Sequence, residues 1–185
     1  MNAGLDHAPV IETARLRLRP PRLEDYPACV AMWADPRVVE HITGVASTPQ
    51  QTWARVLGYA GHWMLLGFGY WAIEDRASAT YVGELGFADF KREIDPEMRG
   101  VPEAGWALAP TARGRGFATE ALVAAVAWAD RALASTRTIA LIAPANVASL
   151  RVAEKAGYRM FKSGSYRGEP TSFYERERSK ALSER

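Results

Sequence analysis

The sequence predicts a single α/β domain. Its 185 residues suit one domain with a substantial core, and no internal repeat or low-complexity linker divides them. Two runs with strand character, residues 68–74 and 81–87, flank a short polar loop, which is typical of a β-hairpin. Further along, an apolar run at 103–109 leads into a glycine-rich loop and then a long helical pattern. Together these features favour a sheet flanked by helices.

The N-terminal part of the chain predicts one strand and a first helix ahead of that hairpin. Residues 13–20 alternate leucine with arginine, which predicts a half-buried strand whose row of Arg15, Arg17 and Arg19 faces solvent. Two prolines end the strand, and the first helix follows them. After this helix, a short turn is expected at residues 38–44.

A second helix is predicted from Pro49 to about Met64. Thr48 suits the N-cap, and proline suits the first helical position because its missing N–H would have no partner there. The apolar stripe of this helix is expected to consist of Trp53, Val56, Leu57, Ala60 and Trp63.

The C-terminal part continues to alternate helices with strands. Small and aliphatic residues at positions 118, 121, 122, 125, 126, 129 and 133 predict a long helix with one buried face. A β-branched run at 138–142 predicts a buried strand. Asn146 suits the N-cap of a further helix, which Gly157 is well placed to end. The last two strands are expected at residues 159–163 and 171–176.

Composition and charge exclude several classes of partner. Lysine and arginine total 23 against 21 acidic residues, so a net charge of +2 gives no electrostatic case for nucleic acid or membrane. No run approaches the roughly 18 apolar residues of a membrane span, and the N-terminus lacks a signal-peptide pattern. The one cysteine, Cys29, suits a reducing cytoplasm, and its apolar neighbours indicate a core residue. No metal site is expected.

The glycine loop, residues 113–119, carries the clearest chemical signal. It joins a strand to the start of a helix, where free backbone N–H groups and the helix dipole favour an anion. Gly114 and Gly116 permit positive φ and close approach of a ligand, while Arg113 and Arg115 bring positive charge. This pattern predicts a binding site for a pyrophosphate.

Two other phosphate motifs fit the glycine loop poorly. The P-loop requires Lys-Ser/Thr after its second glycine, where this chain has Phe117 and Ala118. The dinucleotide fingerprint requires a third glycine where Thr119 stands, and an acidic residue after the next strand, where Ala143 and Pro144 stand. A nucleotide-binding oxidoreductase therefore remains a weaker alternative.

The loop resembles the acetyl-CoA-binding signature Gln/Arg-x-x-Gly-x-Gly/Ala of the GCN5-related N-acetyltransferase (GNAT) superfamily. Here the signature is Arg113-Gly114-Arg115-Gly116-Phe117-Ala118. The preceding GWALAP and the later PANVAS and EKAGY are similar to one branch, the ribosomal-protein N-terminal acetyltransferases (RimJ/RimL-like). The similarity extends over about residues 12–176, and its specific motifs lie within 103–158.

The resemblance implies a GNAT-like domain over residues 10–178, with loose tails at 1–9 and 179–185. Such a domain has a mixed, mostly antiparallel sheet flanked by about four helices. The resemblance also implies that the sheet is splayed at its centre, where the strand at 103–109 separates from the strand at 138–142.

The same resemblance implies that acetyl-CoA is the co-substrate and that no metal takes part. Backbone amides of the glycine loop would bind the pyrophosphate. The pantetheine arm would lie in the splay, where amides near Leu108 point at the thioester and Asn146 bonds the arm. The expected acetyl-CoA-binding residues are Trp106, Ala107, Leu108, Arg113, Gly114, Arg115, Gly116, Phe117, Ala118, Thr119, Asn146 and Ser149.

Proton transfer depends on fewer signals. Many GNAT members use a tyrosine as acid to the leaving thiolate, but the aligned position here is Ala153. Ser149 is similar to the substitute used in the ribosomal-protein branch, and it is also explained as an ordinary helix serine. For the general base, Glu103 is preferred over Glu84, because it lies on the central strand and Glu84 on the neighbouring one. Ser149 and Glu103 are thus the expected catalytic residues.

The function implied is acetyl-CoA-dependent acetylation of a primary amine by direct attack, in a monomer or homodimer. The acceptor is a protein N-terminus or a small-molecule amine. The alternative is a non-catalytic acyl-CoA-binding or regulatory module, which the alanine at 153 supports. In this family the segment before and within the second helix borders the acceptor pocket. The candidate lining residues are Trp33, His41, Trp53, Tyr59, His62 and Trp63.

Overall fold

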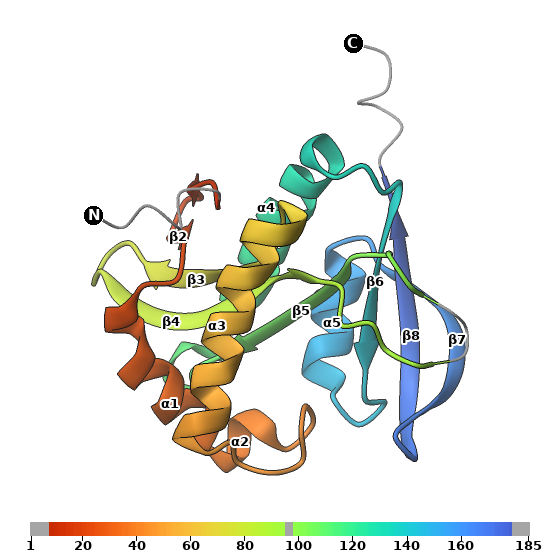
Figure 1. The fold of residues 1–185 in the computed structure, drawn as a ribbon, viewed down its shortest axis with the longest axis horizontal. Coiled ribbons are helices and arrows are strands. Elements are labelled where there is room, and N and C mark those ends of the chain that lie inside the picture. The colour runs from red at the N-terminus through yellow and green to blue at the C-terminus, as the bar shows by residue number, and fades with distance from the viewer. Residues whose placement is uncertain (1–7, 95–97, 179–185) are drawn as a thin grey trace.

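A central sheet of eight strands organises the described chain, in the order β1-β2-β3-β4-β5-β6-β8-β7 (Figure 1). The computed structural model describes residues 8–94 and 98–178. The strands are β1 Ile11–Glu12, β2 Leu16–Arg19, β3 Tyr70–Asp75, β4 Thr80–Ala88, β5 Glu103–Leu108, β6 Arg137–Ile142, β7 Arg159–Tyr166 and β8 Glu169–Glu177. The helices are α1 Tyr26–Ala34, α2 Pro36–Val39, α3 Pro49–Leu66, α4 Phe117–Ala132 and α5 Val147–Lys155, with short 3-10 turns η1 Leu23–Asp25 and η2 Pro110–Ala112.

The predicted fold class is confirmed. Among the described strands only β5 and β6 pair in parallel, and every other neighbouring pair is antiparallel. In Figure 1, α3 crosses one face of β3, β4 and β5, with α1 beside it, while α4 and α5 lie on the opposite face. Within the described ranges, no helix combines the length and the apolar character that a membrane span requires.

The splay at the centre of the sheet is also present. The register of β5 and β6 contains one residue pair, Glu103 opposite Ile139, supported by a hydrogen bond from the Ile139 N–H to the Pro102 carbonyl. Beyond this point the two parallel strands diverge. The sheet is continuous on both sides of the opening, because β4 pairs with β5 over six residue pairs and β6 pairs with β8 over another six.

The main core lies between the sheet and α4, whose small residues allow close contact. Ala121, Leu122 and Ala125 of α4 are fully buried there, as their helical spacing predicts. Trp128 also contacts this core, and its ring packs edge-on against Trp71 of β3 with centroids 5.0 Å apart. Aromatic rings in such T-shaped pairs add stability beyond the area that they bury. The core therefore holds α4 closely against the sheet.

Two local predictions, the apolar stripe of α3 and the turn at 38–44, were wrong in part. The buried residues of α3 are Thr52, Tyr59 and Trp63, whereas Trp53 and Leu57 of the predicted stripe are exposed. The first two residues of the predicted turn, 38 and 39, belong instead to the short helix α2, which Asp35 caps by accepting a hydrogen bond from the Arg37 N–H, and the turn begins at Glu40. At the N-terminus, residues 1–7 of the predicted tail lie outside the described chain. Ala8 is buried, however, and the Pro9 carbonyl accepts a hydrogen bond from the Trp71 indole.

The arginine row of β2 is not wholly solvated, contrary to prediction. Arg19 is only 4% exposed, since it donates two hydrogen bonds to Asp25 and one to Glu74. These carboxylates raise the pKa of the Arg19 guanidinium above its usual value. Arg15 and Arg17 remain substantially exposed. The predicted alternation of the strand is confirmed, but its polar face is partly covered, because Asp25 of η1 packs against Arg19.

We expect Arg19→Met to destabilise the fold by about 3–5 kcal/mol, because it leaves the Asp25 carboxylate buried without its arginine partner and removes the buried one of the two arginines that bind Glu74. Urea unfolding at neutral pH measures this loss. Arg17→Met is the matched control, since Arg17 bonds Glu74 from an exposed position and its loss is expected to change stability little. Equal midpoints for the two variants would contradict the structural role of Arg19.

Candidate functional site

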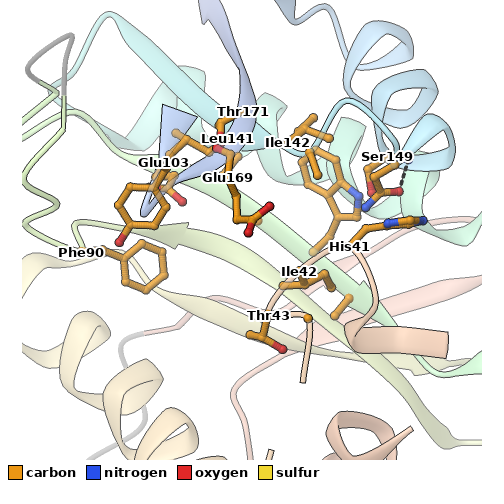
Figure 2. Close-up of a pocket in the computed structure, with 18 of the residues that line it drawn as sticks. His41, Ile42, Thr43, Phe90, Glu103, Leu141, Ile142, Ser149, Glu169 and Thr171 are labelled. Carbon is orange, nitrogen blue, oxygen red and sulfur yellow. Dashed lines mark hydrogen bonds between the residues drawn. The ribbon is translucent and has the colours of Figure 1, made fainter. Parts of the chain in front are cut away.

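A cavity of about 930 Å³ opens where β5 and β6 diverge. Its wall combines the end of α1, the turn that follows α2, the middle of α3, the start of β3, strands β4 to β6, the start of α5 and the turn between β7 and β8. Figure 2 shows Glu103 and Phe90 toward one end of this cavity, with His41 and Ser149 toward the other. Of the predicted site residues, those in the lining are Glu103, Trp106, Ala107, Asn146 and Ser149.

The splay leaves backbone N–H groups of β5 without a strand partner. Successive residues of a strand point their amides to opposite edges. The Ala109 N–H donates to Val82, next to β4, whereas the Pro102 carbonyl accepts from Ile139 of β6. The amides of Trp106 and Leu108 therefore face β6, at positions where β6 no longer pairs with β5. Such amides are suited to receive a developing negative charge.

The glycine loop lies at the far end of the same strand and outside the lining of the cavity. Gly114 and Gly116 have φ of 73° and 77°, the left-handed conformation expected of them. The backbone N–H groups of residues 114–119 donate no hydrogen bond to any other described residue. Free amides at the start of a 16-residue helix fit a phosphate group.

The arginines of the glycine loop were predicted to bring positive charge to an anion, but their side chains bind other parts of the protein. Arg113 donates to the Arg37 carbonyl at 2.6 Å, and Arg115 forms an ion pair with Asp75 at 3.0 Å. The ring of Phe117 is buried in the main core. Through these contacts the loop is anchored on three sides. An anion would therefore meet mainly its backbone amides.

Arg15, on the other side of the loop, holds the first turn of α4. It donates to the Arg115 carbonyl at 2.8 Å and forms an ion pair with Glu120 at 2.6 Å. Glu120 also accepts from the hydroxyl of Thr13. Glu120 thus connects the segment before β2 to the first turn of α4, where a carboxylate also complements the helix dipole.

Asn146 and Ser149 begin α5 at the end of the diverging strand β6. The side-chain oxygen of Asn146 accepts from the Ser149 N–H at 3.1 Å, which is the predicted N-cap (Figure 2). This bond uses neither the amide nitrogen of Asn146 nor the hydroxyl of Ser149, and both residues line the cavity. Ala153, which replaces the tyrosine of other family members, is fully buried one turn later.

Glu84 lies on β4 directly opposite Ala107 of β5. Its carboxylate accepts hydrogen bonds from Trp33 at 3.0 Å, from Tyr81 at 3.1 Å and from Tyr59. Burial raises the pKa of Glu84, and the hydrogen bonds reduce this rise without cancelling it. A carboxyl group with a raised pKa in a cavity is a candidate proton acceptor.

Glu103 lies four residues before Ala107 on β5, at the end of the splay where β6 still pairs. Its carboxylate binds Arg92 in a bidentate ion pair, at 2.7 and 2.9 Å. The Arg92 guanidinium is in turn held between the rings of Phe90 and Tyr166. This arrangement joins the segment after β4 to the end of β7, and it gives Glu103 an arginine ion-pair partner, whereas Glu84 is bound by neutral donors.

Only half of the aromatic candidates reach the cavity. Trp33, His41 and Tyr59 line it, whereas Trp53, His62 and Trp63 do not. Trp63 packs into the main core, and the His62 ring bonds the Gly58 carbonyl at 2.7 Å. Cys29 is buried as predicted, and burial raises its pKa to about 12, which is unsuited to a nucleophile.

Arg55, Tyr70 and Arg92 were missed by the sequence interpretation, yet all three line the cavity. Arg55 and Tyr59 are four residues apart on α3, and this spacing could have identified a polar face. Tyr70 stacks on Tyr59 with ring centroids 4.4 Å apart, and a Cβ at Gly105 would collide with the Tyr70 hydroxyl. The glycine on β5 therefore admits a tyrosine between Glu84 and Glu103.

No group of three or more potential metal ligands occurs within the described ranges. The site thus consists of free amides, a buried carboxyl group and a polar cavity. Splayed parallel strands beside a glycine loop form the arrangement that the sequence resemblance implied for acetyltransferases. The model of the acetyltransferase (GNAT) domain matches residues 15–159, and this chain belongs to that family.

Individual relatives agree with this membership. A GnaT-family acetyltransferase of Bordetella pertussis, described as putative, is 33% identical, with a TM-score of 0.80 over 91% of this chain and 99% of that one. The uncharacterized protein YkkB of Bacillus subtilis is 32% identical over 110 residues, which cover 60% of this chain and 62% of YkkB. This chain therefore spans less than two thirds of YkkB. RimL, a ribosomal L7/L12 alpha-N-protein acetyltransferase solved with coenzyme A, shares the fold at 17% identity and a TM-score of 0.73, covering 91% and 98% of the two chains.

Proposed function

We propose that this protein transfers the acetyl group of acetyl-CoA to a primary amine by direct attack, without a covalent acetyl-enzyme. One observation carries the proposal: β5 ends in a splay that frees the amides of Trp106 and Leu108, between the glycine loop and the cavity that contains Glu84. We expect the enzyme to be cytoplasmic, since Cys29 is unpaired and buried.

The residues present fit acetyl-CoA, which when bound supplies the activated acetyl group. The free amides at 114–119 would hold its pyrophosphate, as phosphates bind helix starts elsewhere. Asn146, at the end of β6, would bond the pantetheine arm through its amide nitrogen. The Leu108 N–H, and that of Trp106 beside it, would stabilise negative charge on the thioester oxygen. RimL, which has this fold, was solved with coenzyme A, and this supports the choice of donor.

The register favours Glu84 over Glu103 as the group that accepts the amine proton. Glu84 lies opposite Ala107, next to the amides of the splay, whereas Glu103 lies four residues away. A strand advances about 3.3 Å per residue, so the backbone positions of the two glutamates are separated by roughly 13 Å along the strand direction. Glu103 is also neutralised by Arg92. Glu84 removes a proton from the incoming ammonium, directly or through one water molecule.

Ser149 is proposed to hydrogen-bond the departing sulfur from the start of α5. We expect Ser149→Ala to lower kcat roughly five- to tenfold, the effect of one lost hydrogen bond, while the Kd for acetyl-CoA stays nearly constant. Initial rates and calorimetric titration measure the two quantities. Ser163→Ala, on exposed β7, is the control. An unchanged kcat would remove Ser149 from the mechanism.

A non-catalytic acyl-CoA-binding module is the second candidate, and the buried Ala153 in place of a tyrosine favours it. Mass spectrometry of a panel of amines incubated with acetyl-CoA separates the two. The panel should contain peptides with free N-termini, polyamines and amino acids. An acetylated product above the uncatalysed background supports the enzyme. Binding of acetyl-CoA without any product would identify the module.

A further inference from the structure

The wall of the cavity contains a guanidinium group, that of Arg55, which forms no hydrogen bond or ion pair with another described residue. Arg55 lies on α3 one turn before Tyr59, and both side chains line the cavity. No hydrogen bond or ion pair joins Arg55 to another described residue, and its Nε is buried without a partner. The guanidinium carbon lies 3.7 Å from the centre of the Trp33 ring. A cation fixed against an aromatic face, with its donors unused, is suited to a carboxylate.

The other cavity arginines differ from Arg55. Arg92 uses its Nε and one terminal nitrogen on Glu103. Arg167 lies on the exposed turn between β7 and β8, where its guanidinium is 5.2 Å from the Tyr166 ring centre. Among the described arginines of the lining, Arg55 is therefore the partly buried one that forms neither a hydrogen bond nor an ion pair with the protein.

Charge compensation of Glu84 does not fully explain why Arg55 lies in the cavity wall. Trp33 contacts both groups, because its indole N–H donates to Glu84 at 3.0 Å while Arg55 stacks on its face. The charge of Arg55 lowers the pKa of Glu84, yet burial outweighs it and the pKa stays raised. The two side chains also form no ion pair within 4.0 Å. The guanidinium thus has donors left for a ligand, close to the proposed base.

The cavity also contains carboxylates that suit an ammonium group. Glu169, whose carboxylate points into the cavity in Figure 2, and Glu40 are both exposed and line it. A ligand that is anionic throughout would be repelled by these groups. A ligand that is cationic throughout would be repelled by Arg55. The charges together favour a ligand with one group of each sign.

We propose that the acceptor is an amino acid, whose carboxylate binds Arg55 while its amine is presented to Glu84. This inference rests on the proposed acetyl transfer and specifies its substrate class. Carboxylate and guanidinium form two parallel hydrogen bonds, which would also orient the amine. The apolar and aromatic wall around them accommodates the side chain of the amino acid.

The test compares amino acids with their amides, which keep the amine and lose the carboxylate. Initial rates are measured for L-alanine, L-methionine, L-phenylalanine and L-glutamate, each beside its α-amide, with acetyl-CoA saturating. A charged hydrogen bond is worth about 1.5–3 kcal/mol, so we expect KM for the amides to be roughly 10–150-fold higher. Arg55→Gln should raise KM for the acids to the level of the amides and leave the amides unchanged.

Two further variants separate recognition from an indirect effect. Arg55→Lys keeps the positive charge and should retain part of the preference for acids, whereas Arg167→Gln should leave the acid-to-amide ratio as in the wild type. The inference is overturned if the wild-type protein uses acids and amides equally. It is also overturned if Arg55→Gln slows both alike and shifts the pH profile, because Arg55 would then act through Glu84.

Calorimetric titration of the same acids and amides into the complex with coenzyme A requires no turnover. If no amine is acetylated, the proposed function fails, while a preference for acids that disappears in Arg55→Gln would still establish the carboxylate site. If an amine is acetylated but acids and amides bind equally, the enzyme stands and the amino-acid acceptor is excluded.

Discussion

Gly116→Trp is expected to abolish the stabilisation of the protein by coenzyme A. A ligand at 100 times its Kd stabilises a folded protein by about 2.7 kcal/mol, which for a chain of this size raises Tm by roughly 5–10 °C. An indole at 116 crowds the free amides of the glycine loop, where the pyrophosphate is proposed to bind. Thermal unfolding with and without coenzyme A measures the loss directly.

Gly67→Trp is the matched control for this substitution. Gly67 ends α3 with φ of 72°, against 77° for Gly116, so both variants experience similar backbone strain of about 1–2 kcal/mol. A Cβ at Gly67 meets no atom within 4 Å, and the residue is outside the cavity lining and the glycine loop. The control should therefore show a lower Tm that coenzyme A still raises by the full amount. A full shift in Gly116→Trp as well would exclude the loop as the pyrophosphate site.

Local signals explain why the glycine loop and its flanking elements were predictable. Left-handed glycines and a free helix start depend on neighbours within a few residues, and the structure has Gly114 and Gly116 in that conformation. The buried face of α4 follows from helical spacing alone. The seven predicted strands are all present, because each is bounded by turn residues that end it.

Long-range pairing explains what was missed. The alternating pattern of a strand does not distinguish an arginine that faces solvent from one that is paired and buried. Arg19 is buried in part because it bonds Glu74, which lies 55 residues away in the sequence. On α3, hydrophobicity favoured Trp53 as a buried residue, whereas it lies at the surface and packs edge-on against Tyr26. The choice between two glutamates likewise depends on the register of β4 and β5, which no single segment reveals.

Glu84→Gln is expected to lower kcat by about 10²–10⁴, the usual contribution of a general base, with little change in the Kd for acetyl-CoA. Because the pKa of Glu84 is raised above its usual value, the acidic limb of the kcat/KM profile of the wild-type protein should lie at higher pH than for an ordinary glutamate. That limb should be lost in Glu84→Gln. Steady-state kinetics over a pH series measures both changes.

Both glutamates line the same cavity, so a second variant is needed to decide which of them is the base. Glu103→Gln is that variant. It removes one charge of the pair with Arg92, so we expect lower stability with only a modest loss of kcat. Glu84→Gln should instead cause a large loss of kcat without a loss of stability. Folding raises the pKa of Glu84, so the folded protein binds this proton more tightly than the unfolded chain does. The ionised carboxyl group therefore lowers the stability of the protein as pH rises from the unfolded pKa through the higher folded pKa.

The neutral amide of Glu84→Gln removes this cost while its oxygen can still accept hydrogen bonds from Trp33 and Tyr59. At pH 7 the variant should therefore be at least as stable as the wild-type protein, although nearly inactive. Loss of activity together with loss of stability would instead indicate that Glu84 mainly supports the fold. A large loss of kcat confined to Glu103→Gln would assign the base to Glu103, at the closed end of the splay.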